Sequence, residues 1–375
     1  MGMVLHHFKK MIHKINIASI KVLNRILLNK DIFKLRLYLY FHSSNLLQDS
    51  YKNILIICGH GAGDYLLASS AIMALNNKFR DSSVTIIFTR KEALELAKVN
   101  DLHNRHNLIF STDINVITEK QDIAIVLSGS SPEVINILSF LQPKAMIGFI
   151  FSFKIFSSIK NISVTKDYLF ENHIQRNDYI ITLLGGSPTG NIEFANSSLQ
   201  SNKKNIIGNF LPITKPLKAL NTEQIFEVVD RQIKSGQYLY VYHLVFKDEY
   251  LTNKDFYEQL KNQIADDSFK IKVFSNWIEL IDLMVSCKKI YCIDSVAYHI
   301  ANGLNIDSLC IFGPTNAKNY IPNNSVGHTI NLNESEIHCY YGTGHKKCIC
   351  TKNNFKTDDL QCGYMLKLNI EDHYS

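Results

Sequence analysis

Asp294, Ser295 and His299 are the side chains of this sequence whose types and spacing are best suited to holding a ligand. Asp294 and Ser295 follow a short apolar run, Lys289–Ile293, and can cap a helix that carries His299. The first N–H groups of such a helix have no partner within the helix and attract phosphate groups. The segment therefore predicts a site for a phosphorylated ligand.

A second apolar run, Ser308–Phe312, follows this helix and ends at Gly313 and Pro314. The succession of strand, helix, strand and loop is typical of an open α/β sheet, in which ligands bind outside the carboxyl ends of the strands. Gly313 and Pro314 are therefore expected at the same edge of the sheet as Asp294. When His299 is considered without its neighbours, the alternative to a ligand contact is a structural role, either in the core or in capping the helix.

A glycine-rich turn, Cys58–Asp64, follows the first apolar run of the chain and reads CGHGAGD. Its three glycines let the backbone turn tightly and approach a ligand closely, which makes Gly63 a candidate ligand contact. Asp64 stands at the start of the next helix. It can take a proton from a hydroxyl nucleophile as a general base, and the alternative is that it only caps the helix.

The alternating glycines of this turn also allow a site for a nicotinamide dinucleotide. The G-x-G-x-x-G spacing is not met, however, and no acidic residue ends the second predicted strand near Thr89. A nicotinamide-dependent oxidoreductase is therefore an alternative that the spacing disfavours.

The elements that position these residues alternate between strand and helix from Lys52 onward. In the first half we expect strands at Ile54–Ile57, Val84–Phe88, Ile123–Leu127 and Ala145–Phe149, and helices at Tyr65–Phe79, Lys91–Val99, Ser131–Leu141 and His173–Leu184. In the second half we expect further strands at Ile206–Leu211, Tyr238–Val245 and Lys270–Phe274, and helices at Thr222–Lys234, Asn253–Ala265 and Trp277–Cys287. This alternation predicts βαβ units and parallel sheets.

Two such halves in 375 residues predict an α/β protein with two Rossmann-like domains facing a cleft that holds the site. A stretch rich in Gly, Ser and Asn predicts the linker between them. The expected divisions are a basic helical extension at 1–50, a first domain at 51–184, the linker at 185–205, a second domain at 206–330 and a cysteine-containing tail at 331–375.

The formal net charge of +6 lies entirely in residues 1–50, which contain eight Lys or Arg residues and two Asp residues. The basic residues are interleaved with Ile, Leu and Val, a pattern typical of a helix that lies on a membrane surface. We therefore expect residues 1–45 to contact a membrane, and the alternative is a helix packed on the body of the protein. Nucleic acid is disfavoured as a partner because the remainder of the chain is neutral.

The overall composition, 46% hydrophobic and 20% charged, fits a soluble globular protein. The longest apolar stretch, Ala145–Phe156, is interrupted by Lys154 and is too short for a membrane span. The N-terminus lacks the compact apolar core and small-residue cleavage site of a signal peptide. We expect a cytoplasmic protein, peripheral on the inner face of the membrane where the basic extension attaches.

The eight cysteines fall into two groups. One group occupies apolar strand or helix contexts and is expected to be buried thiols: Cys58, Cys287, Cys292 and Cys310. The other lies near the C-terminus: Cys339, Cys348, Cys350 and Cys362. Its spacing lacks paired C-x2-C knuckles, so free thiols are favoured over a structural zinc, and no metal is expected in the site.

Two segments of the chain resemble the family 9 glycosyltransferases, which include the lipopolysaccharide heptosyltransferases. The first is the segment around Cys58–Asp64, which is similar to the opening of that family. The second is the Asp-Ser…His helix at 294–299 with the loop Phe312–Thr315, which is similar to its second signature. The segment 209–218 resembles, more weakly, the family's phosphate loop.

The resemblance implies a GT-B fold in which the second domain holds a nucleotide sugar, with an ADP-linked heptose favoured and no cofactor required. It implies transfer with inversion to a lipopolysaccharide or another lipid-linked surface glycan, in a bacterial cell. The implied general base is Asp64. The implied donor-binding residues are Asp294, Ser295, His299, Gly313, Pro314, Thr214 and Lys218. Lys215 is an alternative to Lys218. For the segment 209–218 as a whole, the alternative is an exposed basic loop without a ligand contact.

The sequence departs from the family's motifs at three sites. Cys58 stands where an arginine is common, Val296 replaces a glycine, and Leu211-Pro212 replaces a proline-glycine pair. A non-catalytic GT-B relative that binds a nucleotide sugar or a glycan is therefore a further alternative.

Overall fold

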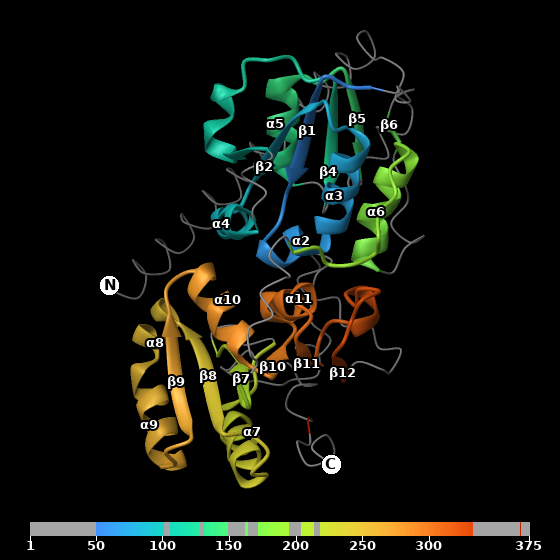
Figure 1. The fold of residues 1–375 in the computed structure, drawn as a ribbon. Coiled ribbons are helices and arrows are strands. Elements are labelled where there is room, and N and C mark those ends of the chain that lie inside the picture. The colour runs from blue at the N-terminus through green and yellow to red at the C-terminus, as the bar shows by residue number, and fades with distance from the viewer. Residues whose placement is uncertain are drawn as a thin grey trace, which may run out of the picture. The chain divides into compact units, whose positions relative to one another are not determined.

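The computed structural model describes residues 50–100, 106–127, 131–148, 162–163, 172–194, 204–213, 218–332 and 368. Within these ranges the chain forms two six-stranded parallel sheets (Figure 1). The predictions for the basic extension, for Thr214 and Lys215, and for the four C-terminal cysteines concern residues outside these ranges. The α/β class and the parallel sheets are confirmed.

The first sheet has the strand order β3-β2-β1-β4-β5-β6. Its strands are β1 (Asn53–Cys58), β2 (Ser83–Phe88), β3 (Asn107–Phe110), β4 (Ile123–Leu127), β5 (Ala145–Gly148) and β6 (Ile162–Ser163). The helices after β2 and β4 are α4 (Lys91–Val99) and α5 (Pro132–Leu141), and η2 (Ser111–Val116) is a 3-10 segment. Buried aliphatic side chains of β1, β4 and α5 form one core cluster, so α5 covers one face of this sheet.

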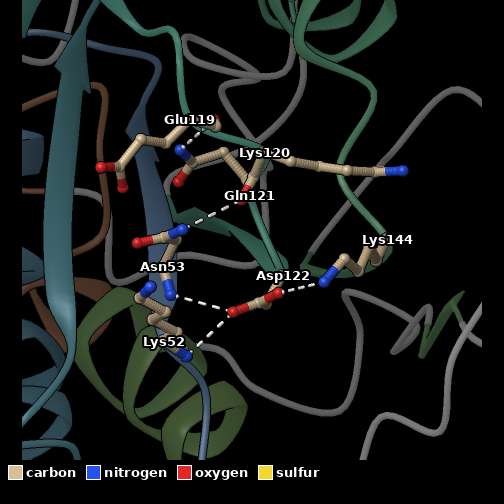
Figure 2. Close-up of polar contacts among 7 residues, drawn as sticks. All are labelled: Lys52, Asn53, Glu119, Lys120, Gln121, Asp122 and Lys144. Atoms are coloured by element: carbon tan, nitrogen blue, oxygen red, sulfur yellow. Dashed lines mark hydrogen bonds and ion pairs between the residues drawn. The ribbon is translucent and has the colours of Figure 1, made fainter.

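Asp122 ties together the amino ends of three neighbouring strands of the first sheet (Figure 2). Its Oδ2 accepts the backbone N–H groups of Lys52 and Asn53, both at 2.9 Å, and its Oδ1 lies 2.6 Å from Nζ of Lys144. Burial by itself raises the pKa of Asp122, but the hydrogen bonds and the charge of Lys144 lower it below the ordinary value. This contact lies at the opposite end of the strands from the glycine-rich turn.

The single helix expected at Tyr65–Phe79 is wrong, because the segment forms α2 (Ala62–Leu67) and α3 (Ser69–Lys78). The N–H of Ala68 donates to the carbonyl of Tyr65 at 3.0 Å, a tight turn, and the hydroxyl of Ser69 donates to the carbonyl of Leu66 at 2.6 Å. A serine hydroxyl that bonds back to a helical carbonyl destabilises and bends a helix, which is consistent with the break at Ala68.

The second sheet has the strand order β12-β11-β10-β7-β8-β9. Its strands are β7 (Ile206–Phe210), β8 (Tyr240–Phe246), β9 (Phe269–Phe274), β10 (Lys289–Ile293), β11 (Asp307–Phe312) and β12 (His328–Asn331). The helices that precede or connect them are α6 (His173–Leu183), α7 (Thr222–Lys234), α8 (Lys247–Thr252), α9 (Lys254–Ile264), α10 (Trp277–Ser286) and α11 (Val296–Gly303), with the 3-10 turn η5 (Ala317–Asn319). One face packs against α7 and α9, and α10 and α11 contact the central strands.

When the described residues are grouped by their contacts, they form two compact units. The boundary between the units does not follow the sequence order of the two sheets. One holds the first sheet, and the other holds the second sheet together with Ala62–Asn77, the described part of Glu95–Asn104, and α6. Helix α2, which carries Asp64, therefore belongs to the same compact unit as α11. The domain divisions expected from the sequence stay a prediction.

The expected strands and helices are present with ends shifted by a few residues at most, apart from the helix at Tyr65–Phe79. Elements that the pattern missed are short or half-exposed: β3, β6, β12, α8 and the two 3-10 segments. The four cysteines expected in apolar contexts are buried free thiols, as predicted. No helix in the described ranges has both the length and the apolar character needed to cross a bilayer.

Candidate active site

The candidate site lies at the carboxyl ends of β7 and β10, which are neighbours in the second sheet. From β7 the chain proceeds to β8 and β9 on one side of the sheet, while β10, β11 and β12 extend on the other side. The two central strands therefore form a topological switch point, where the loops separate and leave a crevice for ligands. Asp294 follows β10 directly, and Lys218 lies in the connection after β7.

Asp294 is buried at this switch point, and its carboxylate is held by two side chains. Its Oδ2 lies 2.5 Å from Nζ of Lys218 and also accepts the hydroxyl of Thr315, and its backbone N–H donates to the carbonyl of Ile311 at 2.9 Å. Burial raises the pKa of this carboxyl, but the charge and hydrogen bond of Lys218 and the bond from Thr315 outweigh burial and lower it. Asp294 is therefore ionised, and its charge fixes the ammonium group of Lys218 beside the helix that follows.

The capping interaction expected from Asp294 and Ser295 is wrong. Ser295 occupies the N-cap position of α11 with extended backbone, but its hydroxyl accepts no N–H of the helix, and the carboxylate of Asp294 bonds to Lys218 and Thr315 instead. Among the described residues the buried Oγ of Ser295 has no hydrogen-bond partner. An eight-residue helix thus begins with a buried hydroxyl that is left without a protein partner, beside a lysine.

His299 lies one turn into α11 and is buried, as its sequence position allowed. Burial lowers the pKa of the imidazole to about 4, partly offset by the charge of Asp294, so the ring is neutral near pH 7. Its Nδ1 has no hydrogen-bond partner among the described residues. A neutral imidazole with an unmatched ring nitrogen can donate or accept a hydrogen bond from a ligand.

Helix α2 packs against α11 and brings Gly63 next to His299. A Cβ atom on Gly63 would lie 3.3 Å from Cδ2 of His299, so a side chain at this position would crowd the imidazole. Asp64 follows in the first turn of α2 and is half-buried. The structure therefore places Gly63 and Asp64 in the same compact unit as His299, with Gly63 next to the imidazole.

Gly313 and Pro314 are buried in the turn after β11, directly before Thr315. The sequence assigned a ligand contact to these two residues, whereas the described contact to Asp294 comes from Thr315. Thr315 stands in the same motif but was not among the expected donor-binding residues. The motif's Thr could have been predicted only by knowing that the turn after β11 reaches the carboxyl end of β10.

Comparison with known proteins bears on the fold. No protein-family model matches the chain, and no curated protein matches it by sequence. Among solved structures, a family 9 glycosyl transferase from Veillonella parvula superposes with a TM-score of 0.61 at 15% identity, over 77% of this chain and 88% of the other. The structure of the Escherichia coli ADP-heptose LPS heptosyltransferase II superposes with a TM-score of 0.54 at 15% identity, over 74% of this chain and 90% of the other.

A third structure, E. coli heptosyltransferase WaaC with ADP, gives a TM-score of 0.57 at 11% identity, over 75% of this chain and 93% of the other. The chain has the GT-B fold of the family 9 glycosyltransferases. The resemblance stated from the two motifs is therefore confirmed for the fold. These superpositions establish the GT-B architecture of two Rossmann-like domains. At identities of 11 to 15% they do not establish the reaction, which has to be argued from the site.

Proposed function

We propose that this GT-B protein is an inverting glycosyltransferase that moves a heptose or a related sugar from an ADP-linked donor to a lipopolysaccharide or another lipid-linked surface glycan. The observation that carries the proposal is the set of groups at the start of α11. Lys218 stands there against Asp294, and Ser295 and His299 offer buried polar atoms without protein partners in the described residues.

These groups suit a diphosphate. The N–H groups at the start of α11 and the ammonium of Lys218 supply positive potential, and the hydroxyl of Ser295 can donate to a phosphate oxygen. Negative charge grows on the diphosphate as its bond to the sugar breaks. Donors that are already oriented toward that charge lower the barrier, so no metal is needed in the proposed mechanism.

Asp64 is the proposed general base. Its carboxylate takes the proton of the acceptor hydroxyl while that oxygen bonds to C1 of the sugar from the side opposite the diphosphate. The bond from C1 to the diphosphate oxygen breaks, the electron pair leaves with the nucleoside diphosphate, and the configuration at C1 inverts. Asp64 is half-buried, which is consistent with access to an acceptor.

The basic extension supports the finer part of the proposal. Residues 1–45 have the composition of a membrane-surface helix, which would hold the protein at the inner face of the membrane beside a lipid-linked acceptor. Deletion of residues 1–45 should abolish binding to vesicles that contain anionic lipid and leave donor binding unchanged. Retained vesicle binding would remove these residues as the anchor.

Calorimetry with ADP, GDP, UDP and NAD on the full chain tests the donor class. Selective binding of ADP supports the proposal, and selective binding of GDP or UDP keeps a glycosyltransferase but changes the sugar. Preference for NAD would contradict it in favour of an oxidoreductase. Absence of all binding would favour the non-catalytic relative that the departures at Cys58 and Val296 suggest.

A transfer assay tests the reaction itself. With ADP-heptose and a lipid-linked acceptor, the product should carry the inverted anomeric configuration, which NMR of the released glycan reports. Retention at C1 would exclude Asp64 as a base in a single displacement.

A further inference from the structure

Tyr320 stands on a loop that two asparagines hold in place beside the candidate site. The side chain of Asn316 accepts the N–H of Lys318 at 3.0 Å and so caps η5. Asn172, the N-cap of α6, donates through Nδ2 to the carbonyls of Lys318 and Ile321, at 3.1 and 2.8 Å. These two carbonyls lie on either side of Tyr320, so its backbone position is fixed.

The ring of Tyr320 is packed between aromatic side chains. It lies parallel to Phe312, with the centroids 6.1 Å apart and the planes at 18°, and its centroid is 4.7 Å from that of His173. The imidazole of His299 lies 6.3 Å away on another side. The ring therefore has one orientation, set by residues of β11, α6 and α11.

The hydroxyl of Tyr320 lies in the electrostatic field of both candidate carboxylates. Burial raises its pKa, Asp294 and then Asp64 raise it further, and Arg176 lowers it. The phenol therefore stays protonated at every physiological pH. A protonated phenol in this position is a fixed hydrogen-bond donor.

We propose that the Tyr320 hydroxyl is a sugar-binding group that holds the transferred sugar of the donor, an inference that rests on the proposed function. In a single displacement the sugar lies between the leaving diphosphate and the base. The diphosphate belongs at the start of α11 beside Asp294, and the base is Asp64. The Tyr320 ring lies beside His299, and His299 also contacts the position of Gly63, the residue before Asp64. Tyr320 is therefore next to the place where the residues assigned to the diphosphate and to the base come together.

Comparison of ADP with ADP-heptose separates the sugar from the phosphate contacts. In Tyr320→Phe the ring and its packing stay and only the hydroxyl is lost. We expect calorimetry on the full chain to give the same affinity for ADP within about twofold and an affinity for ADP-heptose about tenfold weaker, as for one lost hydrogen bond. The control is Tyr250→Phe, whose hydroxyl donates to Glu258 at 2.9 Å on an exposed surface, and which should change neither affinity.

Three results would overturn the inference. Equal weakening of ADP and ADP-heptose would place the hydroxyl in the phosphate site, and unchanged affinities would remove it from the donor site. Failure of Tyr320→Phe to fold, measured by circular dichroism, would make the phenol a structural group. If the unaltered chain binds neither ligand, the proposed function itself fails, a result that is separate because it is seen before any substitution.

Discussion

Lys218 and Asp294 form an ion pair that joins the connection after β7 to the end of β10, with Nζ and Oδ2 2.5 Å apart. The two residues are 76 positions apart in the sequence and meet at the switch point of the second sheet. Their side chains are 21% and 6% exposed, so this is a nearly buried pair at the place where a ligand is expected. It gives the ammonium group a fixed position before any donor binds.

Removal of Lys218 should destabilise the protein because it leaves the buried carboxylate of Asp294 without its counter-charge. For Lys218→Met we expect the free energy of unfolding in urea to fall by about 3 kcal/mol. The double variant Lys218→Met with Asp294→Asn should recover most of this loss and still bind ADP poorly. The matched control is Lys234→Met, which breaks an exposed pair with Asp230 and should cost less than about 1 kcal/mol. Equal losses in Lys218→Met and Lys234→Met would contradict the structural role of the buried pair.

Asp64→Asn should fold and bind ADP as the unaltered chain does, because the amide replaces the carboxylate at nearly the same size. Turnover in the transfer assay should fall by about 100-fold or more, since the amide cannot accept the proton of the acceptor. Asp255→Asn is the control, because Asp255 also lies in the first turn of a helix, α9, but is exposed and is not a residue of the candidate site. Near-normal turnover in Asp64→Asn would remove this residue from the mechanism.

Asp122→Ala should weaken the first sheet at the amino ends of its strands. The substitution removes the acceptor of two backbone N–H groups and the partner of Lys144, and we expect a loss of about 2 to 3 kcal/mol at pH 7. Hydrogen exchange of peptides that contain β1 measures this loss locally.

The pH dependence of the Asp122 effect follows from its lowered pKa. The folded-state pKa lies below the ordinary value of an aspartate side chain, about 3.9. The contribution of the carboxylate is therefore present above about pH 4 and is lost as the pH falls through the folded-state pKa. The difference between Asp122→Ala and the unaltered chain should therefore shrink at low pH. Lys144→Ala, whose side chain is 43% exposed, should have a smaller effect, below about 1 kcal/mol.

Asp178 predicts a pH dependence of the opposite sign. Burial raises its pKa from 3.8 to about 6, although hydrogen bonds from Ser70 and the N–H of Gly190 lower it and the charge of Glu193 raises it. The folded protein therefore binds this proton more tightly than the unfolded chain. The resulting stability is fully present below about pH 4 and is lost as the pH rises to about 6, by on the order of 2 to 3 kcal/mol.

Asp178→Asn should remove this loss because the amide stays neutral. The measurement is the difference in the free energy of unfolding between Asp178→Asn and the unaltered chain, at about pH 4 and pH 7. His243 and His299 have pKa values lowered to about 4 by burial and change stability in the opposite direction, but they do so in both proteins and cancel in the difference. A difference that is the same at both pH values would contradict the raised pKa.

The strands of the two sheets and the helices that connect them could be predicted from local pattern. Their apolar periods are strong, and several of the helices begin at a capping residue. β4, β10 and α7 begin and end at the predicted residues, and α7 has a capping box made by Asn221 and Gln224. The pattern failed where buried side chains are few, as in β3, which has none, and where a serine hydroxyl divides a helical period, as at Ser69.

The sequence by itself determined the fold class, the two motifs and the candidate residues Asp64, Asp294 and His299, because those depend on residue types at short spacing. Only the tertiary structure decided that the carboxylate of Asp294 binds Lys218 and Thr315 instead of capping its own helix. It also decided the burial of Asp178 and the place of Tyr320 beside His299. These contacts join residues of different elements, and no local period encodes which elements a sheet brings together.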